Sequence, residues 1–195
     1  MSEHERQAYA PRPAAPVSRD APLPSSLSVR EARDAYLAEN GFDTETYTAE
    51  TVTLMAFGRT WSFPNRPNRQ WAIPLHDLHH VATGFGSDLV GEGEIGAWEL
   101  AAGCRTPIVY ALNATALLVG LFLAPRRMLE AYRAGLRSLA LYRQPIAYDA
   151  LLALDLGTLR ARLGLPAEGL ATHPRRLHEA APAQPAATRE ASASH

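Results

Sequence analysis

The clearest alternation of apolar and polar positions lies in residues 126–143, where apolar side chains recur at intervals of three and four. This spacing places them on one face of an amphipathic helix. The apolar positions are Met128, Leu129, Tyr132, Leu136, Leu139 and Ala140. We also expect a last helix over residues 151–163, because the Gly164 and Pro166 that follow are typical of a helix end.

Residues 108–124 form an almost wholly apolar stretch, which Thr106 and Pro107 precede as the N-cap and first position of a helix. Its polar or glycine interruptions are Asn113, Thr115 and Gly120. A helix of this length spans about 26 Å, short of the roughly 30 Å thickness of the hydrocarbon layer. We therefore expect a helix that is buried on all sides or that lines a lipid groove, with a membrane-spanning helix as the alternative.

The first predicted helix is marked by Ser28 and Glu31, which have the spacing of a capping box. In such a box the Ser side chain and the Glu side chain each bond the other residue's backbone N–H. We expect this helix to extend to about Glu39 and to end at Asn40 and Gly41.

Two short β-rich stretches follow, residues 51–55 and residues 60–63, with Gly58 and Arg59 between them. They predict a short hairpin. Pro74 is expected near the first turn of the next helix, where a proline is tolerated. Because the other predicted elements are helices, the fold class is mainly α, a helical single domain with a small β-hairpin near the N-terminus.

The composition predicts one helical domain between two disordered tails. Residues 1–27 and 171–195 are rich in Pro, Ala and Ser, and they bury too little apolar area to offset the entropy of ordering. This leaves a domain over residues 28–170. The first 28 residues lack the apolar stretch of a signal peptide. A single cysteine, Cys104, fits a reducing compartment, and a net charge of −1 favours no nucleic-acid partner.

The residues His76, Asp77, His80 and Glu92 carry the most informative chemistry. Residues four apart lie on one face of a helix, so His76 and His80 point the same way, and Asp77 leans toward that side. Two imidazoles and a carboxylate are then within reach of one divalent ion. Zinc suits these ligands, with iron or manganese as alternatives. Two histidines and two carboxylates leave coordination positions open, as catalytic sites need.

Glu92 reaches the same ion only if the chain turns back after the first helix. A straight helix would place it roughly 18 Å away. The intervening segment contains Gly84 and Gly86, which end helices readily, and then Ser87 or Asp88 as the start of a second helix. The sequence therefore predicts two antiparallel helices whose connecting turn returns Glu92 to the ion.

This pattern resembles the signature of the ubiquinone (coenzyme Q) biosynthesis protein 4 family, which reads HDxxH, eleven residues, then E. The chain matches it at His76, Asp77, His80 and Glu92. Surrounding residues are similar too, and the resemblance extends more weakly to about Leu165. These surrounding residues are Leu78, Thr83-Gly84, Val90-Gly91-Glu92 and Trp98-Glu99.

The resemblance implies a metalloprotein of ubiquinone biosynthesis that acts on a prenylated benzoate-type ring. The expected reaction is decarboxylation and hydroxylation at ring carbon 1, and the four residues of the signature would be both its metal ligands and its catalytic residues. A Lewis-acid ion stabilises the negative charge that develops as carbon dioxide leaves. Residues 108–124 would take the isoprenoid tail, because each buried methylene contributes about 0.8 kcal/mol.

The resemblance also implies partners and a location. The expected partners are a long-chain prenylated quinone precursor, other ubiquinone-biosynthesis proteins, a second copy of the chain in a homodimer, and the membrane surface. The expected location is cytoplasmic, on the inner face of the membrane. A non-catalytic scaffold that binds a prenyl lipid and organises other biosynthetic enzymes is the alternative function. A metal-dependent hydrolase is a third reading, for which no separate general base stands out.

Other polar residues near the signature carry two interpretations each. His79 points roughly 100° away from His80, which predicts a surface residue or a partner of a ligand rather than a fifth ligand. Asp88 and Glu94 are candidates to orient the ligand histidines, although a helix start also explains Asp88. Asn113 is expected either to bond a backbone carbonyl or to face a ligand head group.

Three further features have a structural and a functional reading. Trp98 is a core residue or a platform for a substrate, and Cys104 is predicted to be a small core residue. The basic residues after the apolar stretch either attract anionic phospholipid head groups or form a solvated helix face. They are Arg126, Arg127, Arg133 and Arg137.

Overall fold

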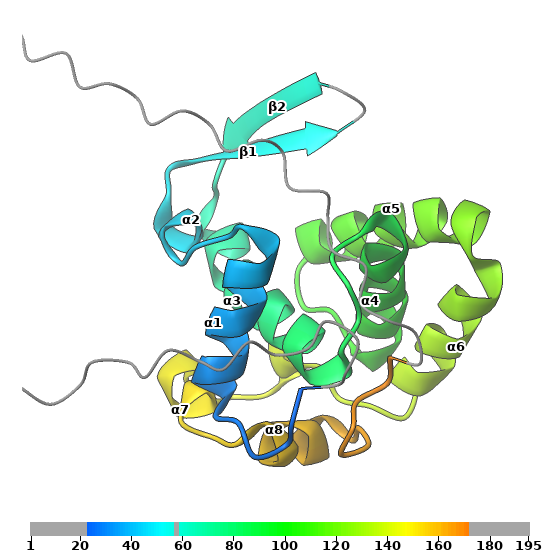
Figure 1. The fold of residues 1–195 in the computed structure, drawn as a ribbon. Helices are drawn as coiled ribbons and strands as arrows, with labels where there is room; N and C mark the ends of the chain where they lie inside the picture. The colour runs from blue at the N-terminus through cyan, green and yellow to red at the C-terminus, as the bar shows by residue number, and fades with distance from the viewer. Residues whose placement is uncertain (1–22, 57–58, 172–195) are drawn as a thin grey trace, which may run out of the picture.

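The computed structural model of the protein describes residues 23–56 and 59–171. Most of them are helical, which confirms the mainly α class (Figure 1). The elements in chain order are α1 (Val29–Asn40), α2 (Glu45–Thr48), β1 (Thr51–Ala56), β2 (Arg59–Pro64), α3 (Pro67–Thr83), α4 (Leu89–Ala102), α5 (Pro107–Leu123), α6 (Pro125–Gly135), the 3-10 turn η2 (Leu141–Arg143), α7 (Tyr148–Leu152) and α8 (Leu156–Leu163).

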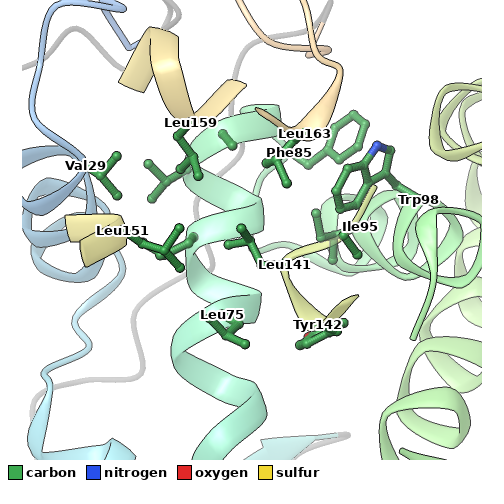
Figure 2. Packing of buried hydrophobic residues seen from close by; sticks show 14 of the residues in the cluster. Val29, Leu75, Phe85, Ile95, Trp98, Leu141, Tyr142, Leu151, Leu159 and Leu163 are labelled. Carbon is green, nitrogen blue, oxygen red and sulfur yellow. The ribbon is translucent and has the colours of Figure 1, made fainter. Parts of the chain in front are cut away.

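Helix α3 runs through the middle of the fold, and α1, α4, α5, α8 and η2 all contact it. On one side, α4 packs against both α5 and α6 (Figure 1). Figure 2 shows how buried side chains from distant parts of the sequence meet around α3. Val29 and Leu151 lie on one side of it, and Ile95 and Trp98 lie on the other. The core therefore holds helix α3 in place from both sides.

Glycines allow α4 and α5 to approach each other closely. A Cβ atom at Gly96 would lie 2.8 Å from the carbonyl oxygen of Asn113, and one at Gly93 would lie 2.9 Å from the Cα of Gly120. Real Cβ atoms do not come this close to backbone, so larger residues would force the helices apart. The close approach places the side chain of Asn113 against the buried face of α4.

Helix α1 has the predicted capping box. The backbone N–H of Glu31 donates to Ser28 Oγ at 3.2 Å, and the Glu31 carboxylate accepts from the backbone N–H of Ser28 at 3.0 Å. Gly41 ends the helix with a φ of 68°, a conformation that favours glycine. The strands β1 and β2 follow after α2 and pair antiparallel, with Thr51 opposite Pro64.

Helix α3 begins earlier than the sequence predicted. Pro67 occupies its first turn, where the missing N–H costs nothing, and Pro74 lies inside the helix. The prediction that Pro74 marks the first turn is therefore wrong. Either proline could mark the first turn of a helix. In the structure the helix begins at Pro67, and one helical hydrogen bond is lost at Pro74.

The predicted helix over residues 126–143 is too long, because α6 ends at Gly135. The backbone N–H groups after it bond to distant elements instead of continuing the helix. Leu139 donates to the carbonyl of Leu163, and Ala140 donates to the carbonyl of Ala102, both at 3.2 Å. These long-range bonds override the apolar pattern, and they carry the chain back across α3 into η2.

The predicted helix over residues 151–163 is in fact two, α7 and α8. Asp155 separates them as the N-cap of α8, where its side chain accepts from the N–H of Thr158 at 2.7 Å. Backbone bonds link this break to the start of the chain described in the structure. Val29 donates to the carbonyl of Leu154, and Leu156 donates to the carbonyl of Leu27, both at 2.8 Å.

Leu23 to Leu27 were predicted to be part of a disordered tail, but they pack against the domain. Leu23 is buried, and its carbonyl accepts from the guanidinium of the buried Arg160 at 2.9 Å. The Leu23 carbonyl thus has a hydrogen-bond partner far away in the sequence, which composition alone could not predict. Ala171, also predicted to be in a tail, donates its backbone N–H to the carbonyl of Thr83 at 3.1 Å. The rest of the predicted tails, residues 1–22 and 172–195, lies outside the described residues.

Helix α5 follows the apolar stretch but is not buried on all sides, so the fully buried alternative is wrong, and the helix that lines a lipid groove stays a prediction. Its buried residues are Val109, Asn113 and Gly120. The exposed apolar group of α5 and α6 consists of Ile108, Tyr110, Leu112, Leu118, Leu121, Phe122, Leu123, Leu129 and Tyr132. Among the residues that the structure describes, no helix combines the length and the apolar character needed to cross a bilayer.

Candidate metal centre

Ligand atoms of His76, His80 and Glu92 converge where α3 meets the start of α4. Within the described residues, these three side chains form a group whose candidate ligand atoms all lie within 4.8 Å of one another. The two Nε2 atoms are 3.1 Å apart. The Glu92 carboxylate lies 3.6 Å from Nε2 of His76 and 3.5 Å from Nε2 of His80. The fold-back predicted from the sequence is therefore present.

These separations suit one small cation. Tetrahedral zinc binds imidazole nitrogen and carboxylate oxygen at about 2.0–2.2 Å, which places neighbouring ligand atoms about 3.3–3.5 Å apart. The three measured separations, from 3.1 to 3.6 Å, lie around this value. Three ligands leave a fourth position open, and the site reaches solvent because the Glu92 side chain is 38% exposed.

The turn between α3 and α4 orients His80 as well as redirecting the chain. Nδ1 of His80 lies 3.1 Å from the carbonyl oxygen of Phe85, which can only accept, so this nitrogen carries the proton. Nε2 is then free of hydrogen and faces His76. Gly84 makes the turn possible with a φ of 81°, and the ring of Tyr36 stacks on His80 at 5.4 Å.

The start of α4 fixes the position of Glu92. Asp88 is the N-cap, and its carboxylate accepts from the backbone N–H of Gly91 at 2.7 Å. Gly91 packs directly on the backbone of Gly86, so a side chain there would push the helix start away from the turn. Glu92 lies in the first turn, where the helix dipole favours a negative charge.

Asp77, the fourth predicted ligand, is placed differently from the other three. It is buried, and its Oδ2 accepts a hydrogen bond from the hydroxyl of Tyr47 at 2.6 Å. Burial raises the pKa of Asp77 to about 6, although the bond from Tyr47 opposes the shift. The structure does not bring Asp77 into the group formed by the other three residues.

Glu99 lies behind the converging ligands at the centre of a second cluster. Its buried carboxylate accepts from Nδ1 of His76 at 2.9 Å and from Nδ1 of His79 at 2.6 Å. The amide of Asn113 donates to it at 2.5 Å, and the hydroxyl of Tyr142 lies 3.1 Å from both of its oxygens. These four donors come from α3, α5 and η2.

The electrostatics follow from this pairing. Burial lowers the pKa of His76, but the carboxylates of Glu99 and Glu92 outweigh it and hold that pKa well above its usual value. Burial lowers the pKa of both His79 and His80. Burial alone would raise the pKa of Glu99, yet the bonds and charges of His76 and His79 bring it below its usual range.

Several residues near the signature have structural roles in place of the functional ones considered from the sequence. His79 is fully buried and bonded to Glu99, and its Nε2 accepts from the backbone N–H of Leu141 at 2.9 Å. It therefore bonds Glu99, the carboxylate that His76 also bonds, and does not lie on the surface. Asp88 serves as the N-cap described above. Glu94 forms an ion pair with Arg127 at 2.6 Å.

The side-chain amide of Asn113 donates to the Glu99 carboxylate. This partner differs from the two that were considered, a backbone carbonyl and a ligand head group. Trp98 is a core residue with no exposed surface, and Cys104 is a buried core residue as predicted. Sequence reasoning missed the role of Glu99. It follows Glu92 by seven residues, two helical turns, so extending the Glu92 face of the helix would have pointed to it.

Comparison with known proteins adds no family assignment. No family model matches the chain, and no curated protein matches it significantly.

Proposed function

We propose that the protein is a divalent-metal protein of ubiquinone biosynthesis, similar to the family named above, that acts on a long-chain prenylated benzoate-type ring. In the proposed reaction the carboxylate on ring carbon 1 leaves as carbon dioxide and a hydroxyl group takes its place, with an oxidant such as molecular oxygen supplying the hydroxyl oxygen atom and accepting the two electrons. The observation that carries the metal-binding part is the convergence of His76 Nε2, His80 Nε2 and the Glu92 carboxylate. The substrate and the pathway rest on the sequence resemblance.

The donor set supports the choice of metal. Two imidazole nitrogens and one carboxylate suit zinc first, and iron or manganese next. A bound divalent cation supplies a Lewis acid, which stabilises negative charge on a ring carboxylate or on a neighbouring oxygen. Glu92 and His76 face the solvent-accessible side, so a substrate carboxylate would approach between them. Asp77 stays in the proposal as a residue beside the site, with its carboxyl group held by Tyr47.

The exposed apolar group of α5 and α6 supports a lipid partner. Phe122 is 89% exposed, and exposing so many large apolar side chains to water is unfavourable unless a partner covers them. Arg126 and Arg133, both exposed, lie among them on α6 and would attract anionic head groups. We propose that this group contacts the inner face of a membrane or the isoprenoid tail. A second copy and other ubiquinone-biosynthesis proteins remain proposed partners.

A scaffold function is the second candidate, because one observation favours it. The exposed apolar side chains of α5 include Phe122, nine residues after Asn113 and therefore about 180° around the helix from it. Asn113 faces the cluster behind the metal ligands, so Phe122 faces away from them. Lipid binding on that side would be separate from the ion, as a non-catalytic prenyl-lipid scaffold requires.

The two candidates differ in what happens when the ion is lost. Glu92→Ala and His80→Ala should each remove the metal from the full-length protein and abolish quinone production in a host that depends on it. Glu168→Ala, which changes an exposed glutamate outside the group of candidate ligands, is the matched control and should leave both unchanged. Metal analysis and circular dichroism would show that the variants are ion-free and folded.

The outcomes are distinct. A folded, ion-free variant that still supports quinone production would reject catalysis at this centre. Mass spectrometry of lipid extracted with the purified protein supplies the second readout. Lipid without metal would favour the scaffold, and the absence of both would reject the resemblance to this family's chemistry.

A further inference from the structure

The two glutamates of α4 that face α3 lie two turns apart on one side of the helix. Glu92 is near Nε2 of His76 and Nε2 of His80, whereas Glu99 accepts from Nδ1 of His76 and Nδ1 of His79. His76 is therefore held between the two carboxylates, with one ring nitrogen directed at each. This arrangement makes Glu99 the residue that controls which nitrogen of His76 is available.

The hydrogen bonds between the histidines and Glu99 can run in only one direction, from the histidine N–H groups to the carboxylate. An ionised carboxylate can only accept, so both bonded histidine nitrogens must carry a hydrogen. The side chain of Glu99 is fully buried, and its oxygens are occupied by donors from His76, His79, Asn113 and Tyr142. His79 confirms the direction from its other side, because its Nε2 accepts the N–H of Leu141 and so carries no hydrogen when the ring is neutral.

The same reasoning fixes the state of His76. With its hydrogen on Nδ1, the neutral ring presents a bare Nε2 at the point where His80 and Glu92 converge. A neutral imidazole with the opposite tautomer would direct an N–H at that point and could not bind a cation there. Histidine ligands commonly donate their second nitrogen to a carboxylate, which fixes the ring and raises its basicity.

We propose that Glu99 is the positioning residue of the metal centre: it holds His76 as the Nδ1–H tautomer and keeps its Nε2 directed at the ion. This inference rests on the proposed binding of a divalent metal by His76, His80 and Glu92. It assigns a function to a carboxylate that touches neither the ion nor the substrate. Asn113, Tyr142 and His79 then serve to hold the Glu99 carboxylate in one orientation.

The test replaces Glu99 with a side chain of the same shape. Glu99→Gln keeps the volume, but the amide is uncharged and has one accepting oxygen. Both histidines bond Oε1 and Asn113 donates to Oε2, so the NH₂ group of Gln must face either the two histidine N–H groups or the Asn113 amide, and it can accept from neither. Glu94→Gln is the matched control, because Glu94 is a buried glutamate on the same helix that forms an ion pair with Arg127. Zinc affinity of each full-length protein is measured by titration against a competing chelator.

We expect Glu99→Gln to weaken zinc binding by about 10–100-fold, the range typical for lost outer partners of metal ligands. Glu94→Gln should stay within about twofold of the wild type, because it leaves the histidines untouched. Unchanged affinity in a folded Glu99→Gln protein would overturn the proposal.

A spectroscopic readout separates positioning from mere stabilisation and needs no variant. Two-bond ¹H–¹⁵N NMR correlations of ¹⁵N-histidine-labelled protein report which ring nitrogen carries hydrogen. We expect His76 to be Nδ1–H with its Nε2 bound to zinc in the loaded protein, and Nδ1–H in ion-free protein at a pH that deprotonates the ring. Hydrogen on Nε2 in the ion-free protein would overturn the proposal. If the wild type bound no zinc, the proposed metal function would fail, and this ion-free spectrum would still decide the role of Glu99.

Discussion

The two clusters between α3 and α4 are built from the same residue types but have opposite hydrogen-bond balances. Around Glu99, four donors meet one carboxylate, and both Glu99 and His79 are fully buried. Around Glu92, three acceptor groups converge without a donor between them when the rings are neutral, and His76 and Glu92 are partly exposed. His76 belongs to both clusters, through a different ring nitrogen in each.

This difference in hydrogen bonding distinguishes a group of side chains that can bind an ion from the side chains that hold that group in place. A satisfied buried network is stable as it stands, because every polar group has a partner. Two bare imidazole nitrogens 3.1 Å apart repel each other unless a proton or a cation lies between them. The Glu92 cluster is therefore the candidate metal site, and the Glu99 cluster is the network that supports it.

The largest effect should come from removing a ligand. His80→Ala takes away one of three converging groups, so zinc affinity should fall by more than the roughly 10–100-fold expected for an outer partner such as Glu99. Isothermal titration calorimetry measures this directly. Because Tyr36 stacks on His80, circular dichroism must show that the variant is folded. Retention of wild-type affinity would show that the ion, if any, binds elsewhere.

The next effect is the pH dependence of binding. The carboxylates of Glu99 and Glu92 outweigh the effect of burial and raise the pKa of His76 above its usual value in the ion-free protein, so a proton competes with zinc for this ring below that pKa. Affinity should therefore rise by about tenfold per pH unit for one proton, and level off above the pKa of His76. Calorimetry below the pKa of His76, in two buffers of different ionisation enthalpy, should report release of about one proton on zinc binding. Equal heats in the two buffers would contradict this.

A smaller effect is expected within the supporting cluster. Tyr142→Phe removes one donor to Glu99, and a hydrogen bond to a charged group contributes about 1.5–3 kcal/mol to stability. Denaturant unfolding should show this loss, whereas the exposed control Tyr110→Phe should not. Zinc affinity should fall less than in Glu99→Gln, because the bond from His76 to Glu99 remains. A larger fall in affinity than in Glu99→Gln would contradict the division into site and support.

The smallest effect on metal binding should come from Asp77→Asn, with zinc affinity changing by less than about tenfold. The pKa of Asp77 is raised to about 6, so folding disfavours its ionised form. Wild-type stability should therefore fall as pH rises from about 4 to about 6, and the Asn variant should lack this component. Unfolding at both pH values, with exposed Asp149→Asn as control, measures it. Loss of zinc binding as severe as in His80→Ala would restore Asp77 as a ligand.

Part of this arrangement could be predicted from local signals in the sequence. The capping box at Ser28, the glycine turn after Thr83 and the spacing of His76, His80 and Glu92 each depend on residues close together in the chain. Helix periodicity and turn chemistry determine such features. They predicted the return of Glu92 to the histidines.

The remainder depends on contacts between distant residues. Gly135 ends α6 where an amphipathic pattern continued, because Leu139 and Ala140 bond to residues on other elements. Asp77 precedes His80 by three positions and leans toward the ligand face, but Tyr47 from another element takes its carboxylate. Tyr142 reaches Glu99 from 43 residues away. No local pattern encodes these pairings.

X-ray diffraction from zinc-loaded crystals, with anomalous data collected at the zinc absorption edge, tests the metal assignment most directly. We predict one ion bound by Nε2 of His76, Nε2 of His80 and the carboxylate of Glu92, each at about 2.0–2.2 Å. An ion located elsewhere, an ion that Glu92 does not contact, or no anomalous peak between the two histidines would contradict it.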